Sequence, residues 1–336
     1  MKPRVLVVDD SAFARTTLAK LLRASGKVEV VGTARDGLDA VARIAELDPD
    51  VVTLDLTMPE LDGVGVLRAL AGRAWPRVIV VSISGGDTEL GAEALSLGAV
   101  DIVAKPTALA SDRLTEVAAE LVAKVVAAGA RAPAIAVAAP APAPRPVRRA
   151  ELALIGTSTG GPQALTQLVA ALPADLAIPV AIVLHIPAGY TEALARRLDQ
   201  VSPLHVVEAA QDLELAPGTV ALARAGFHLR VAQSRSGVLR CVIATAPSRQ
   251  FVPSVDELFE SGAELLGPRV LGVILTGMGD DGLAGARAIH ARGGSLITES
   301  MSTCVVYGMP RVVDEAGLGA TSLPLDRIAG EIARRA

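Results

Sequence analysis

An Ala/Pro-rich segment near the middle of the sequence most constrains what this chain can fold into. Residues 129–149 read GARAPAIAVAAPAPAPRPVRR and are of low complexity. A stretch of this composition cannot pack a core and behaves as an extended, semi-stiff spacer. The length of 336 residues also favours more than one domain. We therefore predict two domains, at residues 1–128 and 150–336, joined by a linker at 129–149.

The composition argues against several classes of protein. Hydrophobic residues make up 51% of the chain, so each half can bury a core. The formal net charge of -4 and the lack of a basic stripe argue against nucleic-acid binding. Cys241 and Cys304 are too few and too far apart to indicate a disulfide framework or a metal site. The N-terminus and the short apolar runs predict no signal peptide and no membrane insertion, so we expect a cytoplasmic protein.

The first half alternates between strand-like and helix-like segments. Amphipathic stretches such as 11–25 and 37–47 carry apolar residues at helical spacing. Five apolar runs separate such stretches, at residues 4–8, 28–33, 51–56, 77–82 and 100–104. This alternation predicts a five-stranded, parallel, doubly wound α/β domain with helices on both faces of the sheet.

Polar residues follow these runs where the ligands of such folds bind, at the carboxyl ends of the strands. Asp9 and Asp10 close the first run and Asp55 closes the third, and three converging carboxylates favour a hard cation such as Mg²⁺. Ser82 ends the fourth run and Lys105 follows the fifth, where they could hold the oxygens of a phosphoryl group. The alternative is that all five are ordinary polar residues at strand ends, some of them capping helices.

The second half also has an α/β pattern. Continuous apolar runs at residues 152–156, 178–187 and 270–277 predict strands that are buried on both faces. Shorter alternating segments at 218–223, 227–231 and 238–243 predict an antiparallel hairpin excursion from a mainly parallel sheet. Helical patterns occur at 162–172, 189–198, 254–266 and 281–291.

A glycine-rich turn follows the first strand of this half, in ELALIGTSTGGPQAL (residues 151–165). No lysine follows Gly160 and Gly161 as a Walker phosphate loop requires, and Ser158 replaces the second glycine of a dinucleotide fingerprint. The turn does match G-x-S-x-G, in which the two glycines permit a sharp turn, clear space for a substrate and expose a reactive serine. The alternative is that Ser158 is an ordinary helix cap.

Two further polar groups follow strands of the same half. His185 ends the run at 178–187, and Asp280 and Asp281 follow the run at 270–277. A serine hydroxyl needs a base, which His185 can supply, and a carboxylate can orient the imidazole. The residues alone do not choose between Asp280 and Asp281. The other histidines, which fit such a site less well, are His205, His228 and His290. For His228 we favour a structural role.

The acidic and basic residues at the strand ends of the first half give residues 1 to about 125 a resemblance to the receiver domain of two-component response regulators. The resemblance implies that Asp55 accepts a phosphoryl group and that Asp10 ligates Mg²⁺ directly. It also implies that Asp9 acts on the ion through water and that the Thr57 carbonyl supplies another oxygen ligand.

By the same resemblance, Ser82 is the switch hydroxyl and Lys105 is the lysine that binds the phosphoryl group. Receivers often carry an aromatic switch residue three positions before this lysine. The chain has Ile102 there, which leaves open how far a hydroxyl–aromatic coupling operates.

A receiver-like half, a linker and the segments GTSTGG, LHIPAGYT, PSVDELF, LTGMGDDG and CVVYGMPR resemble the chemotaxis protein-glutamate methylesterase (CheB) family. The resemblance implies Ser158 as the nucleophile, His185 as the base and Asp281 as its partner. Backbone N–H groups near Thr159 and Met278 would form the oxyanion hole, and the esterase site would need no cofactor. The loop near Arg224 departs from this pattern, since the family usually has a proline there.

This family resemblance also implies a reaction and partners. The enzyme would remove methyl esters from glutamate side chains, and deamidate glutamines, on the cytoplasmic domain of methyl-accepting chemoreceptors. A chemotaxis histidine kinase would supply the phosphoryl group that regulates it. Three alternatives are a response regulator whose second half only binds a partner, a nucleotide-binding effector and a DNA-binding output.

Overall fold

Continuous apolar runs become parallel strands in both halves of the chain, because strands covered on both faces have no polar side. The computed structural model describes residues 1–73, 75–82, 88–105, 111–130 and 149–336. Most of the predicted linker, residues 131–148, lies outside the described residues. The chain folds into two compact units, Met1–Arg131 and Ala132–Ala336.

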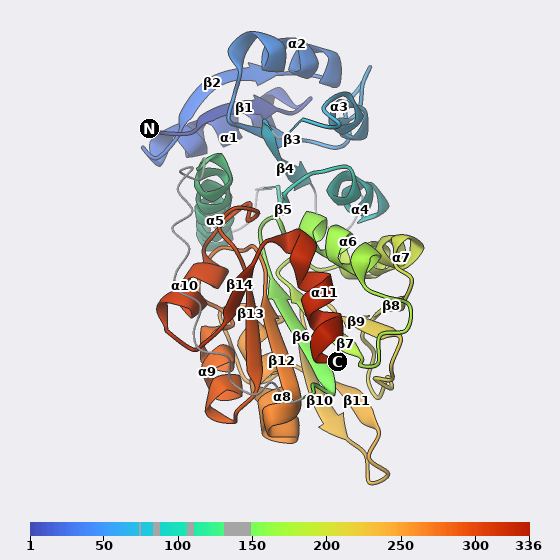
Figure 1. The fold of residues 1–336 in the computed structure, drawn as a ribbon. Coiled ribbons are helices and arrows are strands. Elements are labelled where there is room, and N and C mark those ends of the chain that lie inside the picture. Colours follow the sequence, from blue (N-terminus) through green and yellow to red (C-terminus); the bar gives the residue numbers. More distant parts are fainter. Residues whose placement is uncertain (74, 83–87, 106–110, 131–148) are drawn as a thin grey trace. The chain divides into compact units, whose positions relative to one another are not determined.

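The first unit is a five-stranded parallel sheet in the order β2-β1-β3-β4-β5 (Figure 1). Its strands are β1 (Arg4–Val8), β2 (Glu29–Ala34), β3 (Val51–Leu54), β4 (Arg77–Ser82) and β5 (Asp101–Ala104). Its helices are α1 (Ala12–Ala24), α2 (Gly37–Leu47), α3 (Gly63–Ala69), α4 (Thr88–Ser96) and α5 (Ser111–Gly129). Helix α1 packs against α5, whereas α3 packs against α2 and α4. The predicted doubly wound domain is confirmed.

Polar side chains start the first three helices of this unit. Ser11, Asp36 and Asp62 are the N-caps of α1, α2 and α3, and each accepts a hydrogen bond from a backbone N–H of the first turn. Such caps satisfy donors that have no partner within the helix. They fix the residue at which each of these helices begins.

The second unit contains a seven-stranded parallel sheet in the order β14-β13-β12-β6-β7-β9-β8, and a separate antiparallel pair, β10 and β11. The sheet strands are β6 (Leu152–Thr157), β7 (Val180–Leu184), β8 (His205–Glu208), β9 (Thr219–Leu222), β12 (Val270–Ile274), β13 (Ser295–Glu299) and β14 (Thr321–Leu323). The antiparallel strands are β10 (His228–Gln233) and β11 (Leu239–Ala244). A mainly parallel sheet with an antiparallel hairpin is thus confirmed.

One strand assignment in this unit was wrong. Residues 218–223 were expected in the antiparallel excursion, but β9 pairs in parallel with both β7 and β8. Val220, Ala221 and Leu222 are all fully buried, so β9 is covered on both faces like its neighbours in the sheet. Four residues are too few for the sequence to distinguish a short parallel strand from a hairpin strand.

Helices cover both faces of the large sheet (Figure 1). One core contains residues of α6 (Gly161–Ala171), α7 (Thr191–Val201) and α11 (Leu325–Arg335). The core on the other face contains residues of α8 (Val255–Leu266), α9 (Leu283–Ala291), α10 (Met309–Glu315) and the β10–β11 pair. A 3₁₀ turn at Gly267–Arg269 joins α8 to β12. In the described part of the chain, no helix combines the length and the apolarity needed to cross a membrane.

The strand order places a switch point beside β6. From β6 the chain passes to β7 on one side of the sheet and later returns to β12 on the other. Connections that leave a strand in opposite directions open a crevice at its carboxyl end, where ligands of open α/β sheets bind. The residues that follow β6, β7 and β12 therefore lie where a site is expected.

Candidate active site and metal centre

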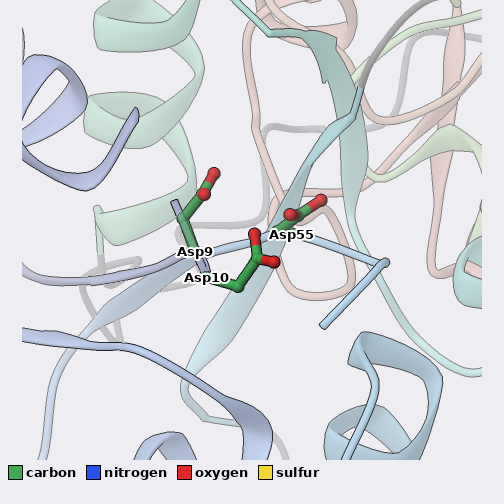
Figure 2. Close-up of side chains that lie close together, drawn as sticks. All are labelled: Asp9, Asp10 and Asp55. Atoms are coloured by element: carbon green, nitrogen blue, oxygen red, sulfur yellow. The ribbon is translucent and has the colours of Figure 1, made fainter. Parts of the chain in front are cut away.

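Three carboxylates meet at the carboxyl edge of the first unit (Figure 2). Asp9 and Asp10 follow β1, Asp55 follows β3, and one oxygen from each lies within 4.8 Å of the other two. Asp9 and Asp55 are buried, whereas Asp10 is exposed. This all-oxygen donor set suits a hard divalent cation, and the exposed Asp10 leaves it a route from solvent.

Lys105 lies against two of these carboxylates. Its Nζ is 2.6 Å from Asp55 Oδ2 and 2.9 Å from Asp9 Oδ2. The backbone N–H of Lys105 donates to the Ser82 carbonyl at 2.7 Å, which ties the ends of β4 and β5 together. Ser82 is buried, and its Oγ has no hydrogen-bond partner within the described ranges. The structure thus gathers the five strand-end residues at one edge of the sheet.

The charges at this edge are not fully balanced. Burial raises the pKa of Asp55, and the hydrogen bond from Lys105 only partly opposes it. Burial alone would lower the pKa of Lys105, but its contacts with Asp55 and Asp9 raise it overall. A further positive charge nearby would stabilise the ionised form of this desolvated carboxylate.

Ile102, which stands at the aromatic switch position, is 1% exposed and lies on β5 opposite Val80. Its side chain belongs to the buried core of the sheet. The structure therefore offers no surface side chain at this position to follow a movement of Ser82.

In the second unit, Ser158 directly follows β6 and is buried. The N-cap of α6 is Gly160 and no side chain caps this helix, so Ser158 is not a helix cap. Gly160 has φ of +83°, which a glycine adopts without strain. A Cβ at Gly160 would lie 2.6 Å from Val305 Cβ, so the space this glycine clears is filled by the protein rather than left for a substrate.

Thr276, just after β12, supports the turn that carries Ser158. Its carbonyl accepts from the Ser158 backbone N–H at 3.1 Å and from Thr157 Oγ1 at 2.7 Å. Its own Oγ1 donates to the Thr159 carbonyl at 2.9 Å. The backbone N–H of Thr276 in turn donates to the buried Glu299 at 2.8 Å, and burial raises the pKa of Glu299. Sequence reasoning missed this support.

Gly277 brings the next loop against the serine. A Cβ at Gly277 would lie 3.0 Å from both the backbone N and the Cβ of Ser158. This close approach, which only a glycine allows, places Met278 in the loop beside Ser158. Thr159 and Met278 therefore lie on the two chain segments that border the serine.

Asp281 is held at the N-terminus of α8. Its Oδ1 accepts from Ser254 Oγ at 2.8 Å and from the Asp256 backbone N–H at 3.0 Å. Its Oδ2 accepts from the Val255 backbone N–H at 2.7 Å and lies 2.8 Å from His185 Nε2. Burial raises the pKa of Asp281, but the hydrogen bonds from His185 and from the helix N–H groups outweigh it and lower the pKa overall. A helix N-terminus favours a carboxylate in this way.

His185 directly follows β7, and its backbone N–H donates to the Thr157 carbonyl at 3.1 Å, one residue before Ser158. Because a carboxylate only accepts, the contact with Asp281 puts the ring proton on Nε2. Nδ1 is buried and has no hydrogen-bond partner in the described part of the chain. The structure thus brings His185 and Asp281 together and leaves Asp280 exposed.

Two residues near this pair were not singled out from the sequence. Ser254 is the N-cap of α8 and accepts from the Glu257 N–H while donating to Asp281. The ring of Phe251 stacks on the imidazole of His185. The S-x-x-E pattern of Ser254–Glu257 signals a helix start, where a carboxylate is favoured, but Phe251 carries no sequence signal.

The other histidines lie apart from this site or support it. His228 is fully buried; its Nδ1 accepts from the Ser254 N–H at 3.2 Å and its Nε2 lies 2.9 Å from the Pro247 carbonyl. His205 is on the edge strand β8, where it contacts Asp199, and His290 is in α9. The structural role favoured for His228 agrees with these contacts.

Two family models match the chain. The model of the CheB methylesterase matches residues 153–332, and the model of the response regulator receiver domain matches residues 5–118. The two matches correspond to the two units of the fold.

Curated proteins match over almost the whole chain. A protein-glutamate methylesterase/protein-glutamine glutaminase 5 of Myxococcus xanthus is 56% identical over 330 residues, which cover 96% of this chain and 95% of that protein. The protein-glutamate methylesterase/protein-glutamine glutaminase of Thermotoga maritima is 39% identical over 97% of this chain and 96% of that protein. A solved structure, the Thermotoga maritima CheB methylesterase catalytic domain, is 36% identical with a TM-score of 0.54 and covers 56% of this chain and 99% of that domain.

Proposed function

The chain belongs to the CheB methylesterase family, with a response regulator receiver domain in its first unit, and we propose that Ser158, His185 and Asp281 form its catalytic triad. The enzyme is a protein-glutamate methylesterase and protein-glutamine glutaminase of the CheB type. The observation that carries the triad proposal is the state of His185. Its Nε2 is hydrogen-bonded to Asp281. Its Nδ1 is buried and has no hydrogen-bond partner in the described chain, and His185 itself lies beside the strand end that carries Ser158.

The arrangement assigns each proton in the reaction. Ser158 Oγ attacks the carbonyl carbon of the γ-glutamyl methyl ester and gives its proton to His185 Nδ1. Asp281 stabilises the resulting imidazolium through Nε2, and its low pKa keeps it ionised throughout. The imidazolium then protonates the leaving methanol as the tetrahedral intermediate collapses. Water hydrolyses the glutamyl-enzyme by the same route, and a glutamine amide leaves as ammonia through the same acyl-enzyme.

Backbone N–H groups near Thr159 and Met278 are proposed to hold the oxyanion of the tetrahedral intermediate. The Ser158 N–H is already bonded to the Thr276 carbonyl, so it is not a free donor for this purpose. The segments that carry Thr159 and Met278 both border Ser158, which supports this assignment. Donors placed where negative charge develops stabilise the transition state.

In the receiver domain, we propose that Asp55 accepts a phosphoryl group in a reaction that needs Mg²⁺. Asp10, Asp55 and the Thr57 carbonyl would hold the ion, with Asp9 acting through water, and the ion would supply positive charge for phosphoryl transfer. Ser82 and Lys105 would bind the transferred oxygens. The all-oxygen donor set and the unpartnered Ser82 Oγ fit these roles.

The partners proposed for the chain follow from this chemistry. Its substrates are the methylated helices of the cytoplasmic domain of a methyl-accepting chemoreceptor, and its phosphodonor is a chemotaxis histidine kinase. A cytoplasmic location follows from both partners. No role in nucleic-acid binding is proposed.

The test of the triad combines a substitution with covalent labelling. Ser158→Ala should lower methanol release from methylated receptor by about 10⁶-fold, and His185→Ala nearly as much, because members of a triad act as a unit. A serine-directed phosphonate should label the natural protein and not Ser158→Ala. Methanol release by Ser158→Ala at the natural rate would refute the proposal.

We also propose that the unphosphorylated receiver restrains the esterase. A linker of about 20 residues keeps the receiver at high effective concentration, so a weak contact suffices for restraint. Deleting residues 1–149 should raise basal methanol release about tenfold, which corresponds to about 1.4 kcal/mol of closure. Equal rates for full-length and truncated protein, with and without a phosphodonor, would contradict this regulation.

A further inference from the structure

The ring of Phe251 covers one face of the His185 imidazole. The ring centroids are 4.2 Å apart and the planes are 9° from parallel. Phe251 belongs to the loop between β11 and α8, which is distant in sequence from the ends of β6, β7 and β12. The proposed acyl-transfer steps do not use this ring.

The backbone that carries Phe251 is fixed on both sides of the ring. Before it, the Pro247 carbonyl lies 2.9 Å from the Nε2 of the buried His228. After it, the Val252 carbonyl accepts from the Gly226 N–H at 3.1 Å, and Ser254 begins α8. The position of the ring is therefore set by the loop rather than by the contact with His185 alone.

Ion pairs hold the same loop against α8. The Arg249 guanidinium donates to Glu257 Oε1 at 2.6 and 2.8 Å and to Glu260 Oε2 at 2.8 Å. Glu257 is 1% exposed and also binds Arg230 at 2.6 Å. One residue separates Arg249 from Phe251, so these contacts limit movement of the ring away from His185.

The stack supplies a constraint that the hydrogen bond to Asp281 lacks. A single bond at Nε2 leaves the imidazole some freedom to rock about its Cβ–Cγ bond, because that torsion has a broad minimum. A parallel ring at van der Waals distance fixes the plane of the imidazole, and the two constraints together fix the direction of Nδ1. The negative face of the Phe251 ring also stabilises the imidazolium that forms when Ser158 loses its proton, and it excludes water from that face.

We propose that Phe251 is a positioning residue of the esterase reaction, which aims His185 Nδ1 at the serine and stabilises the protonated imidazole. This inference rests on the proposed triad. It predicts an effect on the chemical step and not on substrate affinity, because the contact of Phe251 is with His185.

The first test compares three variants. Phe251→Leu should lower kcat about tenfold with KM unchanged, and should slow phosphonate labelling of Ser158 by a similar factor. Phe251→Tyr keeps the ring and should retain both rates. Phe227→Leu is the matched control, since Phe227 is a partly buried aromatic residue of the same unit that packs against Arg224. It should leave both rates unchanged.

The second test separates positioning from a general structural role. Phe251→Leu added to His185→Ala should cause no further loss of labelling rate, because the ring would act only through the imidazole. Losses that multiply in the double variant, equal losses in Phe251→Leu and Phe251→Tyr, or a rise in KM without a fall in kcat would each overturn the inference. If His185→Ala itself kept the natural rate, the triad would fail; if only Phe251→Leu did, this inference alone would fail.

Discussion

Asp55 and Asp281 both lie near the carboxyl ends of buried parallel strands, yet their surroundings differ in kind. Asp55 is bound by Lys105, and a weak contact from the Thr57 N–H at 3.5 Å adds little, so burial raises its pKa. Asp281 receives two backbone N–H groups, a hydroxyl and an imidazole N–H, and its pKa is lowered.

This difference separates two uses of a buried carboxylate. A group that must accept a phosphoryl group and work with a metal ion keeps its oxygens available to incoming partners. A group that must hold an imidazole in one orientation has its oxygens filled by donors of the protein. On the proposed roles, preorganisation lies in the esterase domain and exchangeable ligation lies in the receiver domain.

The largest effect that could break this comparison concerns Asp281. Asp281→Asn should lower kcat by about 10³–10⁴-fold, because the amide presents a donor to His185 Nε2 and favours the wrong tautomer. The matched control is Asp280→Asn, which changes the exposed neighbour and should leave kcat unchanged. A loss of less than tenfold in Asp281→Asn, measured by methanol release, would mean that this carboxylate is not part of a catalytic unit.

The next effect concerns the open ligation of the receiver. Removing Mg²⁺ with EDTA should slow labelling by a small phosphodonor about 10²–10³-fold, because a bound cation stabilises the transferring group by several kcal/mol. Asp55→Asn should abolish the label, whereas Asp48→Asn, at an exposed position, should keep it. Labelling that proceeds unchanged in EDTA would contradict the Mg²⁺ requirement, and full labelling of Asp55→Asn would place the phosphoryl group elsewhere.

A smaller effect would sharpen the description of the Asp281 site. Ser254→Ala removes a hydroxyl that both caps α8 and donates to Asp281. We expect kcat to fall about tenfold, as is typical for a lost hydrogen bond to a charged group, and Tm to fall by about 2–4 °C. Ser254→Thr should restore both. A fall in Tm with an unchanged kcat would assign the hydroxyl to the helix alone.

The smallest effect is a pH dependence of stability. Burial and the neighbouring Asp281 raise the pKa of Asp256 from its ordinary 3.8 to about 6. The folded state then holds a proton that the unfolded state releases, so this contribution is present below about pH 4 and is lost as the pH rises to about 6.

Asp256→Asn keeps the acceptor for the Gly282 and Gly285 N–H groups and removes the titration. Raising the pH from 4 to 6 should lower the Tm of the esterase domain by about 2–4 °C more in the natural protein than in this variant. That difference corresponds to about 1 kcal/mol for a domain of this size, after allowance for solvent screening of a partly buried group. Parallel Tm curves for the two proteins would contradict the raised pKa.

The sequence predicted the sheets well because strands covered on both faces must be continuously apolar. Where the signal was short, as in Thr219–Leu222, it could not tell a parallel from an antiparallel partner. Strand ends also indicated where polar groups would converge, which is why Ser158, His185 and the pair Asp280 and Asp281 could be named in advance, whereas the choice of Asp281 came from the family resemblance.

What the sequence could not supply is orientation and support. Asp280 and Asp281 are adjacent and chemically identical, and only the turn before α9 decides which of them faces His185. Ser254 and Phe251 contact residues 27 and 66 positions away. Neither hydrophobic periodicity nor a motif carries information about such contacts.

The anchoring of Asp281 at the start of α8 has a consequence for changes in chain length. One residue added or lost between Pro247 and Ser254 would change the path of the loop that carries Phe251 and would strain the placement of the Ser254 hydroxyl and the first N–H groups of α8 against the carboxylate. The β10–β11 turn around Arg235, Ser236 and Gly237 is exposed and is not part of this anchor. An epitope tag or a fluorescent reporter inserted there should be accepted, whereas an insertion in the loop before α8 should lower kcat.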